Sequence, residues 1–224
     1  MKKLSLLVGG LVMSTMVLAQ KPDAGTPLSL EGQLGWNTST LSFQAPSIRL
    51  RYFLQDNIAV RATIGLANSK SVDNHYELAN NGGSVGEEIN FTKGWNAAIG
   101  AEYHFAGTDR LSPYAGLDVM FGGGNNGAEW TNYDGFGYNT DYTRVDEAKR
   151  GMFGVNVVAG TDYYFAENFY LGLELGLGFS SNSTKEGVST VTTGGVTTES
   201  KTADGKSSYF GNNAIGTFRL GWRF

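Results

Sequence analysis

The amino-acid sequence predicts an all-β protein, an eight-stranded antiparallel up-and-down β-barrel that spans a membrane. Three observations lead to this fold. Eight segments alternate apolar and polar residues with a period of two, which is typical of β-strands with two different faces. The connections alternate between short turns and long polar segments. No segment has a convincing helical period of 3.6 residues.

The N-terminal segment is predicted to be a secretory signal peptide. Two lysines precede an apolar run, residues 4–18, and Ala19 offers a small residue for cleavage. The run is short for a membrane-spanning helix, which is the alternative. We therefore expect a signal peptide at residues 1–19, a short lead at residues 20–27 and the barrel at residues 28–224.

The composition narrows the class of protein. The 224-residue chain contains no cysteine, so its sheet or core must hold the exported domain together without disulfides. The formal net charge of −4 is mild, and we expect no nucleic-acid partner. Aromatic residues make up 12% of the chain and there are only 4 prolines, which argues against disorder.

The first four predicted strands share one pattern, in which apolar residues occupy every second position. They span residues 28–37, 47–54, 58–66 and 95–105. Their apolar faces consist of Leu28, Leu30, Leu34 and Trp36; Ile48, Leu50, Tyr52 and Leu54; Ile58, Val60, Ala62, Ile64 and Leu66; and Trp95, Ala97, Ile99, Ala101, Tyr103 and Phe105. A tilted strand of about ten residues is long enough to cross a bilayer.

The last four predicted strands continue the pattern over residues 114–121, 153–165, 169–179 and 214–224. Their apolar faces consist of Ala115, Leu117, Val119 and Phe121; Phe153, Val155, Val157, Ala159, Tyr163 and Phe165; Phe169, Leu171, Leu173, Leu175, Leu177 and Phe179; and Phe218, Leu220, Trp222 and Phe224. The terminal strand needs neighbours on both edges, or it leaves backbone groups unpaired. Closure onto the first strand supplies the second neighbour.

The connections differ in length from one side of the predicted barrel to the other. The short turns are residues 55–57, 106–111 and 166–168, and residues 39–44 are also a short connection. The long polar segments are residues 68–92, 124–149 and 181–207. Loops of this length count against a compact soluble domain, but an outer-membrane barrel has short periplasmic turns and long extracellular loops. We therefore place both termini on the periplasmic side.

The polar face of the strands carries charge but no lysine. It holds five carboxylates and five guanidiniums: Glu31, Arg49, Arg51, Arg61, Glu102, Asp118, Asp162, Glu174, Arg219 and Arg223. Arginine is preferred where ion pairs are confined and bidentate. Nearly all ten lie near the short-turn side, which predicts one charged layer across the periplasmic half of the lumen. An ordinary solvated sheet face is the alternative.

Four of the five carboxylates follow a glycine by two positions, so each glycine shares their face. The pairs are Gly100 and Glu102, Gly116 and Asp118, Gly160 and Asp162, and Gly172 and Glu174. Glycine weakens a strand and is tolerated at close approaches. The crowded interior of a small barrel gives such a reason.

Aromatic residues gather at both ends of the strands. Those near the short turns are Phe53, Tyr103, Phe105, Tyr163, Phe165, Phe169, Trp222 and Phe224, and those near the long segments are Trp36, Trp95, Phe121, Phe153 and Phe179. Two aromatic belts that flank an aliphatic band match the two interfaces of a bilayer. Aromatic core residues at strand ends are the alternative. We expect outer-membrane lipids as partners.

These features, together with the ending Phe218–Phe224, resemble the small OmpA/OmpX-type outer-membrane barrels. The resemblance covers essentially the whole mature chain and implies the outer membrane of a Gram-negative bacterium. It also implies that Phe218, Trp222 and Phe224 form a signal that the outer-membrane insertion machinery reads. Because the sequence ends at this strand, we expect no peptidoglycan-binding domain of the OmpA type.

The interior of an eight-stranded barrel is only wide enough for side chains or one small ligand. We therefore expect the charged layer to plug the lumen, and a structural or surface-interaction role in which the extracellular loops contact partners. Small residues on the same face predict a vestibule above the layer: Gly65, Asn96, Ala98, Gly154, Asn156, Gly176 and Gly178. A narrow channel for small solutes or hydrophobic molecules is the alternative, if the layer can rearrange.

Catalysis and metal binding are weaker alternatives. A lipid-modifying enzyme would need a histidine near a serine and a carboxylate at the outer rim, and His75 lies close to Ser71 and Asp73 in sequence. A polar loop produces such neighbours by chance, so we expect no enzyme and no catalytic residue. The acidic residues Asp134, Asp141, Asp146 and Glu147 lack the fixed spacing of a calcium loop. We expect neither a metal nor a cofactor.

Overall fold

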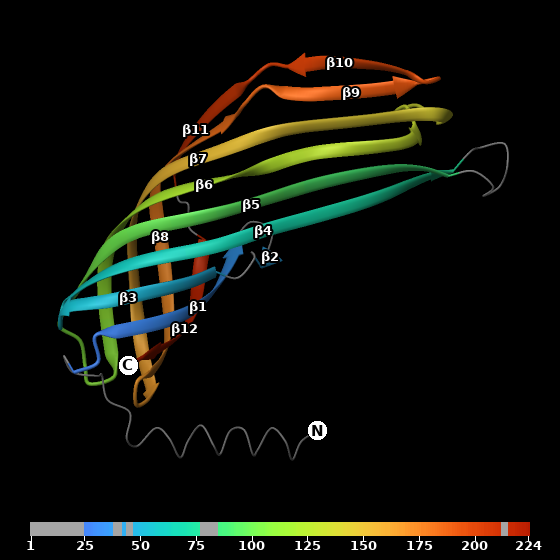
Figure 1. The fold of residues 1–224 in the computed structure, drawn as a ribbon. Coiled ribbons are helices and arrows are strands. Elements are labelled where there is room, and N and C mark those ends of the chain that lie inside the picture. The colour runs from blue at the N-terminus through green and yellow to red at the C-terminus, as the bar shows by residue number, and fades with distance from the viewer. Residues whose placement is uncertain (1–24, 38–41, 44–46, 77–84, 212–214) are drawn as a thin grey trace, which may run out of the picture.

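The computed structural model describes residues 25–37, 42–43, 47–76, 85–211 and 215–224. These residues form strands and the turns between them (Figure 1). No helix within these ranges is long and apolar enough to cross a membrane. The prediction of an all-β antiparallel fold is confirmed. The predicted signal peptide, residues 1–19, and most of the predicted lead lie outside the described residues.

Twelve strands form one sheet. They are β1 (Leu28–Asn37), β2 (Ser42–Phe43), β3 (Ser47–Gln55), β4 (Ile58–Tyr76), β5 (Val85–His104), β6 (Leu111–Tyr133), β7 (Tyr138–Ala166), β8 (Phe169–Thr184), β9 (Gly187–Thr193), β10 (Val196–Thr202), β11 (Gly205–Gly211) and β12 (Ile215–Arg223). Every pairing between them is antiparallel. Sequence neighbours pair along most of the sheet.

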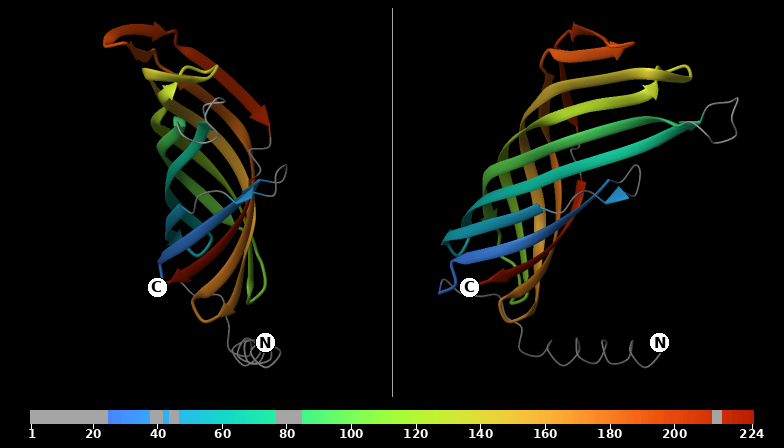
Figure 2. Two further views of the ribbon diagram at one scale, coloured as in Figure 1. Left: turned by 90° about the vertical axis from the view of Figure 1, so that its right-hand side faces the viewer. Right: turned by 45° about the vertical axis from the view of Figure 1, so that its right-hand side comes forward.

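Eight of the strands pair in a closed ring. The order is β1, β3, β4, β5, β6, β7, β8 and β12, and β12 returns to β1. The last contact runs from the pair Ser29 and Arg223 to the pair Asn37 and Ile215. Figure 2 shows the ribbon curling back on itself. Each ring strand therefore has partners on both edges, which satisfies its backbone N–H and C=O groups.

The ring is apolar on its outer face and charged on its inner face. On β3, Leu50 is 45% exposed whereas Arg51 is fully buried at 0%. On β1, Leu30 is likewise exposed and Glu31 is buried. Successive side chains of a strand point to opposite faces, so the alternation in the sequence becomes a division between outside and inside. A water-soluble protein places these two kinds of side chain the other way round.

The segments that the sequence predicts as long loops are largely strands. β4 and β5 stay paired as far as Tyr76 and Val85, and β6 and β7 stay paired as far as Tyr133 and Tyr138. A third long strand pair is built from β8, β9, β10 and β11 and is described in the next paragraph. We call the three pairs the tall hairpins. They rise beyond β1 and β3, away from the C-terminus (Figures 1 and 2). Backbone pairing holds these hairpins together, and both of their faces accept polar side chains, so no apolar alternation marks them.

The third tall hairpin is a long strand pair with interruptions. β8 and β9 pair in turn with β7, and the register changes by one residue between Thr184 and Val188. β11 and β10 pair with β8 and β9 in one continuous register. Gly194 and Gly195 turn the tip with φ of 57° and 79°, the left-handed values that a two-residue type I′ turn requires at both positions.

Candidate functional site

The ten charged residues singled out in the sequence all lie buried inside the ring, with exposures of 0% to 6%. We call them the charged layer. Every ring strand supplies at least one: Glu31 from β1, Arg49 and Arg51 from β3, Arg61 from β4, Glu102 from β5, Asp118 from β6, Asp162 from β7, Glu174 from β8, and Arg219 and Arg223 from β12. The alternation of each strand aims these side chains at one interior space.

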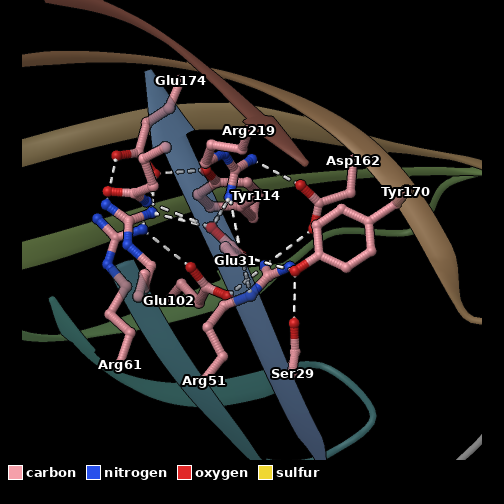
Figure 3. Close-up of polar contacts among 12 residues, drawn as sticks. Ser29, Glu31, Arg51, Arg61, Glu102, Tyr114, Asp162, Tyr170, Glu174 and Arg219 are labelled. Atoms are coloured by element: carbon pink, nitrogen blue, oxygen red, sulfur yellow. Dashed lines mark hydrogen bonds and ion pairs between the residues drawn. The ribbon is translucent and has the colours of Figure 1, made fainter. Parts of the chain in front are cut away.

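Arg51 lies at the centre of one group of ion pairs (Figure 3). Its Nε is 2.6 Å from Oε1 of Glu31, and its Nη1 is 2.8 Å from both Glu102 Oε1 and Asp162 Oδ2. Arg51 belongs to β3 and Asp162 to β7, which stand four strands apart in a ring of eight. This ion pair therefore joins opposite sides of the ring.

Arg61 makes a second connection across the ring. Its Nη2 is 2.6 Å from Asp118 Oδ2 and its Nη1 is 2.7 Å from Glu174 Oε2. Arg61 lies on β4 and Glu174 on β8, again four strands apart. Arg49 also donates two hydrogen bonds to the Glu174 carboxylate, at 2.9 and 3.0 Å. Two separate ion pairs thus span the interior.

The remaining acceptors of the carboxylates are filled by Arg219 and by tyrosines. Arg219 Nη2 donates to Asp162 Oδ1 at 2.6 Å, and its Nη1 lies 3.4 Å from Glu31. The Tyr170 hydroxyl donates to Glu31 Oε1 at 2.7 Å, and the Tyr114 hydroxyl donates to Glu174. Buried charges are tolerated when they are paired, and the carboxylates of Glu31, Asp162 and Glu174 each have a guanidinium partner.

Arg223 has different contacts from the other arginines. Its Nε donates to the Thr26 carbonyl at 2.5 Å, and its guanidinium carbon is 3.8 Å from the centre of the Phe53 ring. Phe53 was expected in the aromatic belt, but it is buried inside the ring, so that expectation is wrong. The reason is its position, since Phe53 is two residues from Arg51 and shares the inner face of β3.

Three further buried polar side chains, those of His104, Ser112 and Ser29, extend the layer. His104 Nδ1 is 2.8 Å from Ser112 Oγ, and His104 Nε2 is 3.1 Å from Glu102 Oε1. Ser29 Oγ is hydrogen-bonded to the Tyr170 hydroxyl. All three are spaced by an even number of residues from a charged residue of their own strand, which is the signal that could have identified them.

The glycines of the sequence repeat face the carboxylates of neighbouring strands. The directly opposed pairs are Gly100 and Asp118, Gly116 and Glu102, Gly160 and Glu174, and Gly172 and Asp162. A Cβ atom built on Gly172 would lie only 2.5 Å from Arg219 Nη2. Gly100, Gly160 and Gly172 therefore leave space that a charged or tyrosine side chain from another strand fills. Gly116 instead lies against the Ala101 carbonyl and the Val158 side chain.

A cavity of about 950 Å³ reaches the charged layer from the side of the tall hairpins. Arg49, Asp118 and Glu174 of the layer line it. Four of the seven small residues expected around a vestibule also line it: Asn96, Ala98, Asn156 and Gly176. Charged side chains thus lie at one end of a polar, largely small-residue chamber.

The three aromatic residues of the predicted insertion signal are exposed on the outer face of β12 and at the chain end. They are Phe218, Trp222 and Phe224. The Trp222 ring stacks on Phe169 with centroids 6.1 Å apart, and Phe224 lies 4.6 Å from Trp222. These rings form part of the aromatic group near the short turns.

His75 lies on a tall hairpin, far along β4 from the charged layer. Its ring stacks on Tyr133 with centroids 3.7 Å apart and an interplanar angle of 5°. Its Nε2 is 3.6 Å from Oε2 of Glu88 on the neighbouring strand. These contacts hold the imidazole between an aromatic ring and a carboxylate.

Two of the four acidic residues considered as metal ligands, Asp134 and Asp146, have separate partners. Backbone N–H groups of Phe136 and Gly137 donate to Asp134 Oδ1 at 2.9 and 3.1 Å, and these bonds lower the pKa of Asp134. Asp146 pairs with Arg144 at 2.7 Å, and its hydrogen bond raises the pKa of Arg144. In the part of the chain that the structure describes, no group of three or more His, Cys, Asp or Glu side chains could hold a metal.

Comparisons with known proteins give one family match. Residues 35–180 match the model of the family described as "Putative OmpA-OmpF-like porin family". A search of curated proteins found no match. Similar solved structures include the outer membrane protease OmpT from Escherichia coli, with 12% identity, a TM-score of 0.43 and coverage of 89% of this chain and 94% of that chain. They also include the outer membrane protein AlkL in DMPC lipid bilayers, with 16% identity, a TM-score of 0.30 and coverage of 91% and 94%.

Proposed function

The chain belongs to the OmpA-OmpF-like porin family, and we propose that its ring of strands is an eight-stranded transmembrane barrel with short periplasmic turns and extracellular tall hairpins. It is an outer-membrane β-barrel protein of a Gram-negative bacterium, as the sequence predicts. Within this family we propose a structural or surface-interaction role. The charged layer would close the lumen, so that the protein is not an open pore.

The division of side chains between the two faces supports the membrane-spanning arrangement. Leu50, Leu171 and Leu175 are among the many aliphatic residues exposed on the outer face. In water this surface would be unfavourable, whereas lipid chains solvate it. A closed ring also leaves no unpaired strand edge in the hydrocarbon, where an unsatisfied backbone group is most costly.

The observation that carries the closed lumen is the pair of ion bridges across the ring. Arg51 reaches Asp162, and Arg61 reaches Glu174, each from the opposite wall. An ion pathway would have to separate these charges in a space that water barely enters. Removing one partner from a buried pair is strongly unfavourable, so the layer is expected to stay closed.

A narrow channel is the second candidate, and the cavity of about 950 Å³ is the observation that favours it. Solutes could enter this chamber from the outside and approach Arg49 and Glu174. Passage would then require the ion pairs to exchange partners. The five-to-five balance of charge makes such an exchange conceivable without a net unpaired charge.

We further propose that the protein is not an enzyme. The contacts of His75 with Tyr133 and Glu88 are those of a packed side chain on an extended hairpin. We propose as partners the outer-membrane lipids around the barrel, the insertion machinery that recognises its C-terminal aromatics, and surface ligands of the tall hairpins.

Conductance in planar bilayers tests the closed lumen. The unmodified protein should give no steady conductance. The double variant Arg51→Ser and Asp162→Ser removes both partners of one ion pair across the ring and should produce small steps in conductance. The matched control is Arg144→Ser with Asp146→Ser, which removes a partly exposed ion pair on a tall hairpin and should give no conductance. Reproducible steps from the unmodified protein would contradict the closed lumen and favour the channel.

A further inference from the structure

The two basic residue types are segregated in this protein. The charged layer contains arginine and no lysine. All six lysines of the described residues lie on the tall hairpins, and five of them form a line across the outer face: Lys70, Lys93, Lys149, Lys185 and Lys206. We call this line the lysine row. Its place outside the barrel suggests a partner other than the interior carboxylates.

The strand register shows that the lysine row faces outward. Lys93 is two residues from Trp95, which is 48% exposed on the outer face of β5. Lys93 lies opposite Asn125, and Asn125 lies opposite Lys149. Directly opposed residues of an antiparallel pair share a face, so the three side chains point the same way.

The other lysines of the row are placed on the outer face by counting residues along their strands from a neighbour that is exposed there. Lys70 is four residues from the exposed Leu66, and Lys206 is four residues from the exposed Phe210. Lys185 continues β8 beyond Phe179 by six residues, and its N–H donates to the Lys149 carbonyl at 2.8 Å. Even spacing keeps all of them on the outer face.

The lysine row runs parallel to the aromatic belt on the hairpin side of the barrel. The lysines stand two to six residues beyond Trp95, Phe153 and Phe179 or their neighbours on the same strands. Four residues correspond to about 13 Å along a strand, or roughly 10 Å along the axis of a tilted barrel. That height coincides with the headgroup zone, and a lysine stem can bend back toward it.

Lys149 and Lys185 border a cavity of about 480 Å³ on this outer face. The cavity forms where the register slips between β8 and β9, because three residues, 185–187, lie opposite only two, 148–149. A bulge of this kind re-aims a side chain. It brings two ammonium groups to one recess, with the Asn125 amide as a further donor.

Two carboxylates also border this cavity, and they limit what it can bind. Glu186 lies 3.3 Å from Lys201, so that its charge is compensated. Glu147 shares the outer face with Lys149 and lies two residues farther toward the hairpin tip. An anion is therefore favoured on the membrane side of the cavity, between Lys149 and Lys185, and disfavoured on its far side.

We propose that the lysine row binds the phosphate groups of an anionic lipid in the outer leaflet, with Lys149, Lys185 and Asn125 as its main site. The aliphatic band below would contact the acyl chains of the same lipid. Lysine suits this task because its ammonium is a compact point charge on a flexible stem. This inference rests on the proposed orientation, with the tall hairpins outside the cell.

Native mass spectrometry of the full chain in neutral detergent tests the site, with diphosphorylated lipid A as the probe. Lys149→Gln and Lys185→Gln should each weaken binding by about fivefold, the effect of one lysine at a membrane surface. The control is the double variant Lys201→Gln, Glu186→Gln, which removes a lysine of the same hairpin together with the carboxylate that it compensates. It leaves the net charge unchanged and should change binding by less than about twofold, as expected for an exposed ion pair.

Two further probes separate the sources of phosphate. Lipid A without phosphates should bind the unmodified protein as weakly as it binds the Lys149→Gln, Lys185→Gln double variant. Millimolar inorganic phosphate should leave lipid A bound. Equal losses from the Lys201→Gln, Glu186→Gln double variant and from Lys149→Gln, or displacement by inorganic phosphate, would overturn the proposal. These titrations use micelles, so their outcome does not depend on the orientation in the membrane or on whether the lumen is closed. An error in either of those proposals would appear instead in cysteine labelling of cells or in conductance across planar bilayers.

Discussion

At the scale of single residues, the interior arginines differ from arginines on the hairpins in the number of their partners. Arg51 contacts carboxylates of β1, β5 and β7 and lies 4.9 Å from the centre of the Tyr170 ring. Arg144 has Asp146 and the Trp130 ring as neighbours and is 41% exposed in its side chain. The same side-chain type should therefore contribute very differently at the two positions.

Replacement of Arg51 tests this difference. Arg51→Ala leaves the charges of Glu31, Glu102 and Asp162 undercompensated, which should lower the free energy of unfolding by about 3–5 kcal/mol. Arg144→Ala should lower it by less than about 1 kcal/mol, because the exposed pair is screened by water. Urea unfolding in liposomes, followed by tryptophan fluorescence, gives both values. Similar losses for the two variants would show that the interior ion pairs contribute no more than the exposed one.

Two neighbouring glycines allow a test of interior packing. Gly221 on β12 lies opposite Glu31, and a Cβ there would overlap the buried Tyr170 ring. Gly32 on β1 lies opposite Leu220, and a Cβ there would meet nothing within 4 Å. Gly221→Ala should therefore destabilise the barrel by about 1–3 kcal/mol. Gly32→Ala should be neutral or slightly stabilising in the same unfolding assay, and a loss as large as that of Gly221→Ala would rule out the packing explanation.

At the scale of strands, the sequence predicted the membrane-embedded segments better than the hairpins. Residues 28–37 coincide with β1, and the predicted strand starts at residues 47, 58 and 169 agree with the structure. Lipid on one side and packed charge on the other impose a strict alternation there. The strand ends near the short turns could be located because a turn adjoins each of them.

The hairpins lacked that signal. β10 reads Val-Thr-Thr-Glu-Ser-Lys-Thr, and each of its side chains is exposed. With water on both faces, nothing imposes an apolar face, and pairing rests on the backbone and on β-branched residues. The Gly194-Gly195 tip was a usable hairpin signal between two threonine-rich and valine-rich segments. The ion-pair partners could not be predicted either, since they depend on which walls of the ring face each other.

The terminal strand carries the prediction about assembly. The Phe224 N–H donates to the Leu28 carbonyl at 2.8 Å, and the Leu28 N–H donates to Phe224 at 3.0 Å. Phe224→Ala keeps these bonds and removes only the ring. If the aromatic side chain is the insertion signal, this variant should lower the amount of folded barrel in the outer membrane, measured by heat-dependent gel mobility. Phe136→Ala, at a fully exposed aromatic of a hairpin tip, is the control and should assemble normally.

At the scale of the whole molecule, the proposed orientation rests on the contrast between tall hairpins and short turns. The chain has no cysteine, so single cysteine variants can be labelled cleanly. A thiol reagent that cannot cross the outer membrane should label Ser200→Cys, on β10, in intact cells. It should label Glu167→Cys, in a short turn, only after the membrane is permeabilised. The reverse pattern would show that the barrel is inserted the other way round.

The contribution of every ring strand to the charged layer has a consequence for the time course of folding. Before β12 meets β1, Glu31 on β1 lacks Arg219, and Asp162 on β7 lacks Arg51, which lies on the other side of the open seam. A half-closed sheet would therefore carry bare charges toward lipid, and the final seam removes that penalty in one step. Partly closed intermediates, in which β12 and β1 are not yet paired, should be short-lived. The finished barrel should open only as a unit. Such a protein would be kinetically long-lived even where its equilibrium stability is modest.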